Sequence, residues 1–153
     1  MDSRVRIVPA EFKHVGTIAR RMRVVDREEC EAMGRTAKQA LRLGILTSDH
    51  AWTALVDDRP EAMFGVVTTS ALSLEGTPWF LGTNEVYRHG RELLMWGPGL
   101  LSRMGDSRLT LRNLVSARNR RAIRLLERWG FRIDEEEISV RGVAFRQFEK
   151  APG

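Results

Sequence analysis

Two polar residues on neighbouring predicted strands are the first candidates for chemistry in this sequence. Glu85 lies near the end of a predicted strand, Trp79–Val86, and strict alternation puts its carboxylate on the same face as Trp79 and Thr83. That face either opens onto a cleft or carries a surface carboxylate paired with an arginine. Asn113 lies on the next predicted strand. Its amide would orient a substrate or water, or satisfy a backbone group between strands that diverge.

Other kinds of site find little support. The three histidines, His14, His50 and His89, show no pairing with a nucleophile, so a hydrolase triad is not indicated. Cys30 is the only cysteine, and no Cys/His cluster has the spacing of metal ligands. We therefore expect no metal site and a reducing compartment.

Arginine carries most of the positive charge. The net charge is +5, and only Lys13, Lys38 and Lys150 are lysines. Five arginines lie on or beside one predicted helix: Arg118, Arg120, Arg121, Arg124 and Arg128. They form either a solvated face or a surface for nucleic acid or phosphate.

The length of 153 residues predicts a single domain over 1–153, with enough chain for one core. The longest apolar run, Leu93–Leu101, is interrupted by Gly97–Gly99 and is far shorter than the roughly 20 residues of a membrane helix. The N-terminal segment has no apolar stretch typical of secretion. We therefore expect a cytoplasmic protein without a membrane-spanning segment.

Hydrophobic periodicity predicts the elements that must position these residues. Asp26 would cap a helix with Glu28 and Glu29 in its first turn and Gly44 as its stop. Turns are expected at 57–60, 75–76 and 141–142. The predicted elements are a strand at Val5–Val8, helices at 11–22 and 26–44, strands at Ala51–Val56, Ala62–Thr69 and Trp79–Val86, a helix at Arg88–Met104 kinked or split at Gly97–Gly99, a strand at Leu109–Val115, a helix at Asn119–Trp129, and strands at Phe131–Val140 and Val143–Phe148.

The order of these elements predicts a mixed α/β (α+β) domain with helices on both faces of the sheet. The strand–helix–strand step from Trp79 to Val115 indicates one parallel neighbour inside an otherwise antiparallel sheet. In the last helix, Asn119 can serve as the cap and Gly130 as the left-handed stop, with Phe131 returning to the core. Between these ends, an apolar stripe would face the sheet: Ala122, Leu125, Leu126 and Trp129.

This order resembles the fold of the GCN5-related N-acetyltransferases (GNAT) over essentially the whole chain. The closest local match is the last helix, where the family often has an Asn, a small residue and Ile, then Leu-Tyr-Glu and Gly-Phe. Those places hold Asn119, Ala122 and Ile123, then Leu125, Leu126 and Glu127, then Gly130 and Phe131. The resemblance implies a GNAT-like mixed, mostly antiparallel sheet of about seven strands.

The resemblance also implies a site for acetyl-CoA, with backbone amides at a helix N-terminus around the pyrophosphate. Here the corresponding loop has one glycine where two or more are usual and is about two residues short. Its basic side chains either compensate or form a solvated first turn. The implied cofactor contacts are Val86, Arg88, His89, Gly90, Arg91 and Asn119.

The catalytic groups implied by the family are only partly present. The tyrosine that often protonates the departing thiolate is replaced by Leu126, and Tyr87, the only tyrosine, is a poor substitute by position. Loss of the donor would cost about 10²-fold in rate. Glu85 is the best candidate for the base that takes the amine proton, directly or through water, and Asn113 is a candidate for positioning.

Two segments, LRNLVSARNRRAIRLLERWGF and PWFLGTNEVYRHGRELL, look similar to a GNAT-like internal virion or virion-assembly protein of short-tailed phages. That likeness implies virion proteins as partners and a place in the host cytoplasm or the particle. The glycine-poor loop and Leu126 favour this interpretation, with a degenerate acyl-CoA site. The alternative is a working acetyl-CoA-dependent N-acetyltransferase that transfers an acyl group to an amine.

Overall fold

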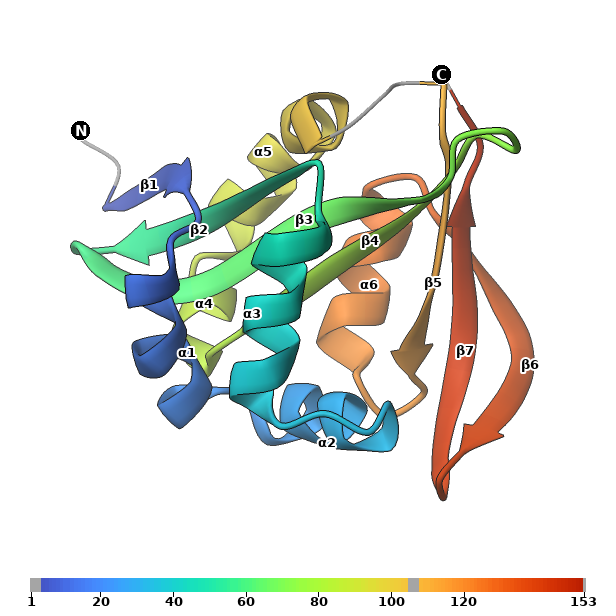
Figure 1. Cartoon of the computed structure of the whole chain (residues 1–153), viewed down its shortest axis with the longest axis horizontal. Helices are drawn as coiled ribbons and strands as arrows, with labels where there is room; N and C mark the ends of the chain where they lie inside the picture. Colours follow the sequence, from blue (N-terminus) through green and yellow to red (C-terminus); the bar gives the residue numbers. More distant parts are fainter. Residues whose placement is uncertain (1–3, 105–107, 153) are drawn as a thin grey trace.

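The computed structural model describes residues 4–104 and 108–152. Figure 1 shows the chain coloured from the N-terminus to the C-terminus. Its elements are β1 (Val5–Pro9), η1 (Phe12–His14), α1 (Val15–Arg21), α2 (Val24–Ala32), α3 (Ala37–Thr47), β2 (His50–Val56), β3 (Arg59–Ser70), β4 (Glu75–Gly82), α4 (Asn84–Tyr87), α5 (Gly90–Met104), β5 (Thr110–Ser116), α6 (Arg120–Arg128), β6 (Arg132–Val140) and β7 (Val143–Lys150).

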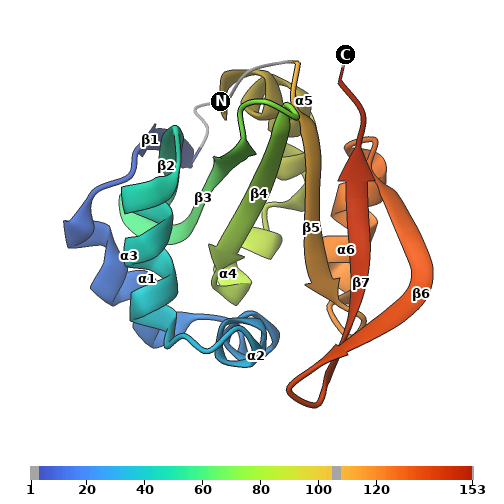
Figure 2. The ribbon, with the colours of Figure 1, turned by 45° about the vertical axis from the view of Figure 1, so that its right-hand side comes forward.

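One seven-stranded sheet organises these elements in the order β1-β2-β3-β4-β5-β7-β6. β4 and β5 are the parallel pair, and the remaining pairs are antiparallel. Helices α1 and α3 lie on one face of the sheet and α5 and α6 on the other (Figures 1 and 2). The expected mixed α/β class, with one parallel neighbour and helices on both faces, is therefore confirmed.

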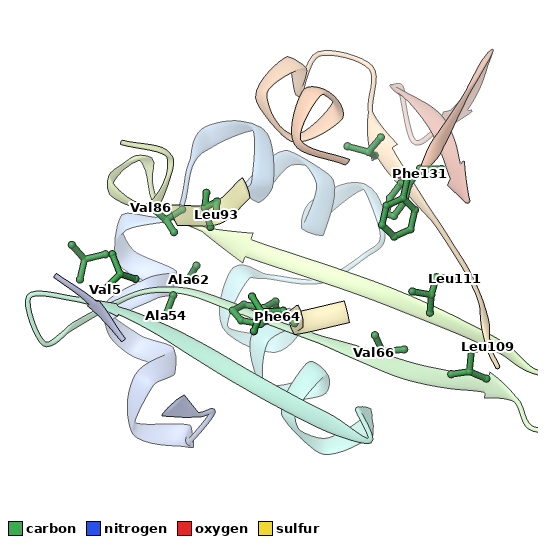
Figure 3. Packing of buried hydrophobic residues seen from close by; sticks show 14 residues of the cluster. Val5, Ala54, Ala62, Phe64, Val66, Val86, Leu93, Leu109, Leu111 and Phe131 are labelled. Carbon is green, nitrogen blue, oxygen red and sulfur yellow. The ribbon is translucent and has the colours of Figure 1, made fainter. Parts of the chain in front are cut away.

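Each face of the sheet has its own core. On the α5/α6 face, the buried cluster contains Phe64 and Val66 on β3 and Leu111 on β5 (Figure 3). On the α1/α3 face, a second cluster contains Ile18 and Leu41, both with no exposed side-chain surface. The sheet therefore separates two apolar layers, and any passage between them must cross it.

The last helix forms as the sequence predicts. The Asn119 side chain accepts a hydrogen bond from the Ala122 amide and caps α6. Gly130 takes a φ of +95°, and Phe131 returns to the core with 5% of its surface exposed. The predicted stripe packs against the α5/α6 core: Ala122, Leu125, Leu126 and Trp129.

The predicted helix over 26–44 is wrong in its boundaries, because two helices occupy that stretch. α2 ends at Ala32, and Gly34 turns the chain with a φ of +81°. Thr36 then starts α3 with a capping box that Gln39 completes. Gly44 does not stop a helix but lies inside α3, where a Cβ atom would stand 2.4 Å from the ring of Trp79.

The predicted strand over Trp79–Val86 is also wrong. β4 begins at Glu75, inside the turn that we expected at 75–76, and ends at Gly82. Thr83 makes the last contact with β3, through its N–H to the Glu61 carbonyl at 2.8 Å. The chain then leaves the sheet and forms the short helix α4 from Asn84, which carries Glu85 with it.

The predicted split at Gly97–Gly99 does not occur, because α5 runs unbroken through this segment. Leu93, Gly97 and Leu100 share one helical face, and all three are buried. The indole of Trp129 packs against Gly97, and its N–H donates to the Leu93 carbonyl at 3.1 Å. Contact with α6 therefore offsets the weak helix propensity of this segment.

The glycines of α5 provide a matched test of this packing. A Cβ atom at Gly97 would lie 1.9 Å from Trp129 Nε1, whereas one at Gly99 would meet nothing within 4 Å. We expect Gly97→Ala to lower the free energy of unfolding by about 1–3 kcal/mol, because Trp129 must move. Gly99→Ala should raise it by up to about 1 kcal/mol through helix propensity. Urea unfolding of both variants checks this, and equal effects would contradict the packing.

Candidate functional site

The parallel strands β4 and β5 separate soon after they begin. They pair only through Glu75 with Thr110 and Gly76 with Leu111, and then diverge (Figure 2). The main-chain hydrogen bond from Thr83 N to Glu61 O shows which residues of β4 bond to β3. In this register the main-chain groups of odd-numbered residues point to β3, and those of even-numbered residues point away from it. The main-chain polar groups of Pro78, Phe80 and Gly82 consequently face the gap between the strands.

Side chains and a neighbouring main-chain amide satisfy most of these groups on β4. Asn113 donates its Nδ2 to the Pro78 carbonyl at 2.7 Å. The Gly82 N–H donates to Asp26 Oδ2 at 2.9 Å, and the Gly82 carbonyl accepts the Arg23 N–H at 3.0 Å. Among the described residues, Phe80 alone keeps an N–H and a carbonyl without a partner on this edge. The described β4 edge of the gap therefore retains one open peptide position.

The facing edge of β5 is satisfied in the same manner. The bond from Ala117 N to Ala144 O shows that odd-numbered residues bond to β7, so the amides of Leu114 and Ser116 face the gap. Leu114 N donates to Asn113 Oδ1 at 2.7 Å, and Ser116 N donates to Glu29 Oε1 at 3.0 Å. Asn113 thus bonds to both strands, as one of its two predicted roles requires.

A polar cluster lies at the open end of this gap, in which Arg23, Asp26 and Asn119 are buried and Glu29 is half-buried. Arg23 NH1 is 3.2 Å from both Asp26 Oδ1 and Asn119 Oδ1. Asn119 Nδ2 is 3.0 Å from Glu29 Oε1. The Arg23 guanidinium also lies 4.2 Å above the centre of the Tyr87 ring. The cluster ties α2 to the N-terminus of α6 across the separated strands.

Burial makes the two carboxyl groups of this cluster unusually basic. Loss of solvent and, to a smaller extent, the nearby Asp26 charge together raise the pKa of Glu29 to about 7, against the hydrogen bonds from Asn119 and Ser116. Burial likewise raises the pKa of Asp26 to about 6, against the opposing charge of Arg23. Glu29 accepts both of its hydrogen bonds through Oε1, so Oε2 has no partner among the described residues.

A cavity of about 500 Å³ passes through the sheet at the gap. Alternate β4 side chains line its two halves, because Trp79 and Leu81 face the α1/α3 core and Phe80 faces the α5/α6 core. What we call the α5/α6 half includes Tyr87, Leu93, Trp96, Leu126 and Trp129. What we call the α2/α3 half includes Glu29, Cys30, Met33, Arg35, Ala40 and Leu43.

The cavity wall contains one thiol and one phenol, and both are weak acids. Burial raises the pKa of the Cys30 thiol to about 12, so at neutral pH it stays protonated and is a poor nucleophile. Burial, followed by the charge of Asp26, raises the pKa of the Tyr87 phenol above its ordinary value. The Tyr87 hydroxyl makes no hydrogen bond with the described residues, and its ring lines the cavity.

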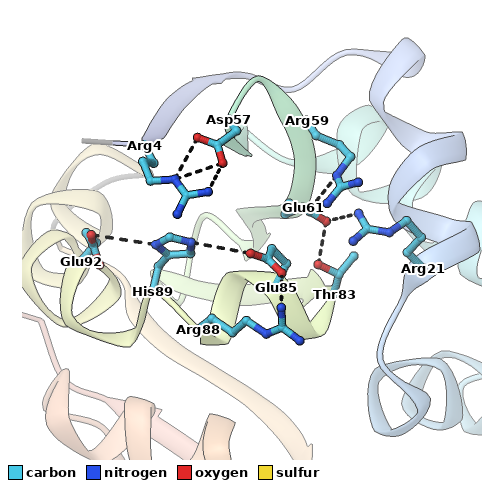
Figure 4. A network of polar contacts seen from close by, with 10 residues as sticks. All are labelled: Arg4, Arg21, Asp57, Arg59, Glu61, Thr83, Glu85, Arg88, His89 and Glu92. Atoms are coloured by element: carbon cyan, nitrogen blue, oxygen red, sulfur yellow. Dashed lines mark hydrogen bonds and ion pairs between the residues drawn. The ribbon is translucent and has the colours of Figure 1, made fainter. Parts of the chain in front are cut away.

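The structure does not bring Glu85 into the cavity. Glu85 lies on α4, where its Oε2 is 2.9 Å from Arg88 NH1 and its Oε1 is 3.9 Å from His89 Nε2 (Figure 4). The face that we expected from strand alternation does not exist, because the chain is helical there. The alternative interpretation, a carboxylate paired with an arginine, describes the observed contacts. Asn113 and Asn119, in contrast, both line the cavity.

The other predicted cofactor contacts are largely engaged elsewhere. Val86 is buried in the core with 1% exposure. The amides of Arg88 and His89 bond back to the carbonyls of Glu85 and Val86, at 3.1 and 3.2 Å. The His89 ring lies between two carboxylates, about 4 Å from each (Figure 4). Gly90 and Arg91 remain, in the first turn of α5.

Sequence reasoning missed the residues that line the gap from α2. Asp26 and Glu29 are three residues apart, so on a helix they share one face, and Arg23 lies three residues before Asp26. That spacing was the available signal. We instead interpreted Asp26 as a helix cap, whereas the structure places it within α2 with 2% exposure.

The remaining expectations concern metals, membranes and the arginines. Within residues 4–104 and 108–152 there is no cluster of His, Cys, Asp and Glu that could hold a metal ion. In the same ranges no helix is long and apolar enough to cross a membrane. The five arginines on and beside α6 are exposed. Their proposed contact with nucleic acid stays a prediction.

Solved structures with the same fold match almost the whole chain. The ribosomal L7/L12 alpha-N-protein acetyltransferase RimL, in complex with coenzyme A, has a TM-score of 0.66 at 9% identity over 97% of this chain and 94% of its own. A spermidine N-acetyltransferase chimera from Vibrio cholerae and hSSAT has a TM-score of 0.66 at 12% identity over 97% and 96%. The aminoglycoside acetyltransferase AAC(6')-Ib with coenzyme A has 0.63 at 13% over 96% and 94%.

These comparisons establish the fold. A GNAT-family acetyltransferase from Bacillus anthracis also matches, with a TM-score of 0.64 at 11% identity over 96% of this chain and 93% of its own. No protein-family model and no curated protein matches the sequence. The chain has the GNAT acetyltransferase fold, as the order of its elements predicted.

The raised pKa of Glu29 predicts how stability depends on pH. Between about pH 4.5 and 7 the folded protein retains a proton that the unfolded chain has released. The free energy of unfolding should therefore fall as pH rises through this window, by on the order of 3 kcal/mol from Glu29. Glu29→Gln should flatten the slope in urea unfolding, and Glu31→Gln, an exposed control on the same helix, should not. Parallel slopes in all three proteins would contradict the burial of Glu29.

Proposed function

We propose that this protein is an acetyl-CoA-dependent N-acyltransferase. The observation that carries the proposal is the cavity that crosses the sheet between β4 and β5, with Glu29 in its wall. A reaction between two substrates that enter from opposite faces needs such a passage and a base inside it. The coenzyme A complexes of two structures with this fold support the choice of cofactor.

The α5/α6 half suits the pantetheine arm of the cofactor. Its walls are apolar, and the free N–H and carbonyl of Phe80 offer one peptide-like pair to an amide of the arm. The first turn of α5 offers the amides that follow His89 to a phosphate, with Arg91 in that turn. Arg121 is exposed, and its charge reaches Tyr87, which places it beside this half. Acetyl-CoA, when bound, would supply a thioester carbonyl for attack by an amine.

Glu29 is the base in this proposal. An amine must lose a proton as it forms an amide bond, and a carboxylate with a pKa of about 7 accepts a proton efficiently near neutral pH. Glu29 lines the α2/α3 half at the gap, so an amine that enters there meets it before the thioester. Asn119 and the Ser116 amide hold Oε1, which leaves Oε2 for the amine or an intervening water.

Tyr87 is the proton donor for the departing thiolate. Leu126 occupies the place of the usual tyrosine and has no proton to give, although it lines the same half of the cavity. Tyr87 reaches that half from α4, where its hydroxyl would first donate a hydrogen bond to the thiolate; its raised pKa keeps the phenol protonated but makes it a weaker acid than an ordinary tyrosine. In this proposal Tyr87 on α4 takes the role of the tyrosine that the resemblance would place at Leu126 on the last helix.

The sequence likeness to virion-assembly proteins favoured a different role, with a degenerate cofactor site. The structural comparisons give that role no support, and they favour the alternative of an acetyltransferase. The amides of Arg88 and His89 bond to the carbonyls of Glu85 and Val86, which leaves fewer amides for a diphosphate. We therefore expect cofactor affinity to depend on arginine side chains more than on the loop.

Calorimetry with acetyl-CoA tests the cofactor site. We expect binding in the micromolar range, weakened about tenfold by Arg121→Glu or Arg91→Glu, because each reversal opposes a phosphate. Arg20→Glu reverses an exposed arginine on α1 and should leave affinity unchanged. An absence of heat at millimolar acetyl-CoA in the native protein would refute the proposed function.

Transfer kinetics test the base. Glu29→Gln should lower kcat/KM for an accepted amine by about 10²–10⁴-fold and should abolish the rise in rate through about pH 7. Release of coenzyme A, followed with a thiol reagent, gives both values. Glu31→Gln and Glu85→Gln serve as controls, since neither side chain lines the cavity. A normal pH profile in Glu29→Gln would show that another group is the base.

A further inference from the structure

The α2/α3 half of the cavity is almost entirely apolar. Met33, Ala40 and Leu43 line it from one side, and Trp79 and Leu81 line it from β4. The Trp79 N–H is already satisfied by Ser48 Oγ at 2.7 Å, so the indole offers the cavity an apolar surface. Gly44 lets the ring lie directly against α3. A ligand in this half would therefore bury a hydrocarbon or aromatic group.

Only two charged residues line the described part of this cavity, one of each sign. Glu29 lies at the gap, and Arg35 lies in the turn between α2 and α3. The charges of both act on the Cys30 thiol, so both lie within electrostatic range of the same point. The Arg35 side chain is exposed and forms no ion pair with the described residues. It is therefore available to an anion.

A second guanidinium lies against the turn that carries Arg35, at Gly34. The hairpin between β6 and β7 places Arg141 against the turn, where a Cβ atom at Gly34 would stand 2.4 Å from Arg141 NH1. Arg35 thus lines the half, Arg141 contacts the same turn from outside the lining, and Glu29 is the one carboxylate in the described lining. Such an arrangement attracts one amine and one anion, and it repels a ligand with several positive charges.

We propose that the acceptor is a small primary amine that also carries a carboxylate on an apolar body, of which the apolar α-amino acids are the simplest. The amine would face Glu29, the carboxylate would pair with Arg35, and the side chain would lie among Met33, Leu43 and Trp79. This inference rests on the proposed function for the transfer step, but the binding of the amine does not. Polyamines and aminoglycosides, the substrates named for two structures of this fold, would be poor ligands here.

The transfer step balances without a further reactant. The amine nitrogen forms a bond to the acetyl carbonyl carbon, and the carbon–sulfur bond of the thioester breaks. Glu29 takes one proton from the nitrogen, and the thiolate takes one from Tyr87 or water. The products are an N-acetyl amino acid and coenzyme A.

Direct binding tests the acceptor site without the cofactor. Calorimetry of the full chain with L-phenylalanine should show binding that Arg35→Gln weakens about tenfold, the loss expected for one charge-assisted contact. Arg42→Gln, an exposed neighbour on α3 outside the cavity, should bind as the native protein does. Phenethylamine, which lacks the carboxylate, should bind more weakly and equally to all three proteins. Equal effects of Arg35→Gln on both ligands would overturn the role of Arg35.

Transfer assays then separate the two proposals. We expect kcat/KM for L-phenylalanine to exceed that for phenethylamine and for spermidine by about tenfold or more. Faster transfer to spermidine or kanamycin would overturn the acceptor class while the proposed function stands. Binding of L-phenylalanine without any transfer or acetyl-CoA binding would overturn the function while the ligand class stands. Failure of L-phenylalanine to bind, with transfer to other amines, would overturn this inference alone.

Discussion

The separation of two parallel strands is the constraint on which this structure depends. Once β4 and β5 diverge, each exposes a row of N–H and carbonyl groups that no neighbouring strand can satisfy. Such groups are costly to leave unpaired inside a protein. Here Asn113 bonds to both edges, and the acidic residues of α2 accept the amides of Gly82 and Ser116. The side chains that hold the gap open are thus the same ones that satisfy the main-chain groups of the separated strands.

The same contacts account for the electrostatics of the cavity. A carboxylate that caps a strand edge must be buried, and burial raises its pKa unless cations compensate. Arg23 compensates for Asp26 in part, and Glu29 is less well compensated. A basic carboxyl group at the centre of the gap therefore follows from how the gap is stabilised. The proposed chemistry therefore needs no further residue to raise the pKa of Glu29.

Local patterns were enough to predict the elements whose ends are set by nearby residues. Asn119 and Gly130 fix the ends of α6, and residues 141–142 form the predicted hairpin turn with φ values of 49° and 82°. The polar cluster could not be predicted in this way, because Asp26 and Asn119 meet across 93 positions of the chain. Glu85 was misplaced for a related reason. The end of β4 depends on what β3 offers at Glu61, and alternation within β4 carries no information about it.

The two walls of the cavity differ in how their elements are joined, and the contact between Trp129 and α5 is the reason. The indole fills the space above Gly97 and donates a hydrogen bond to the Leu93 carbonyl, so α5 and the end of α6 pack into one continuous wall. The opposite wall depends on the short turn between α2 and α3, where Met33 and Arg35 are exposed. Evolution can therefore exchange residues in that turn to accommodate new amines, while the half that would hold the acyl donor keeps its shape.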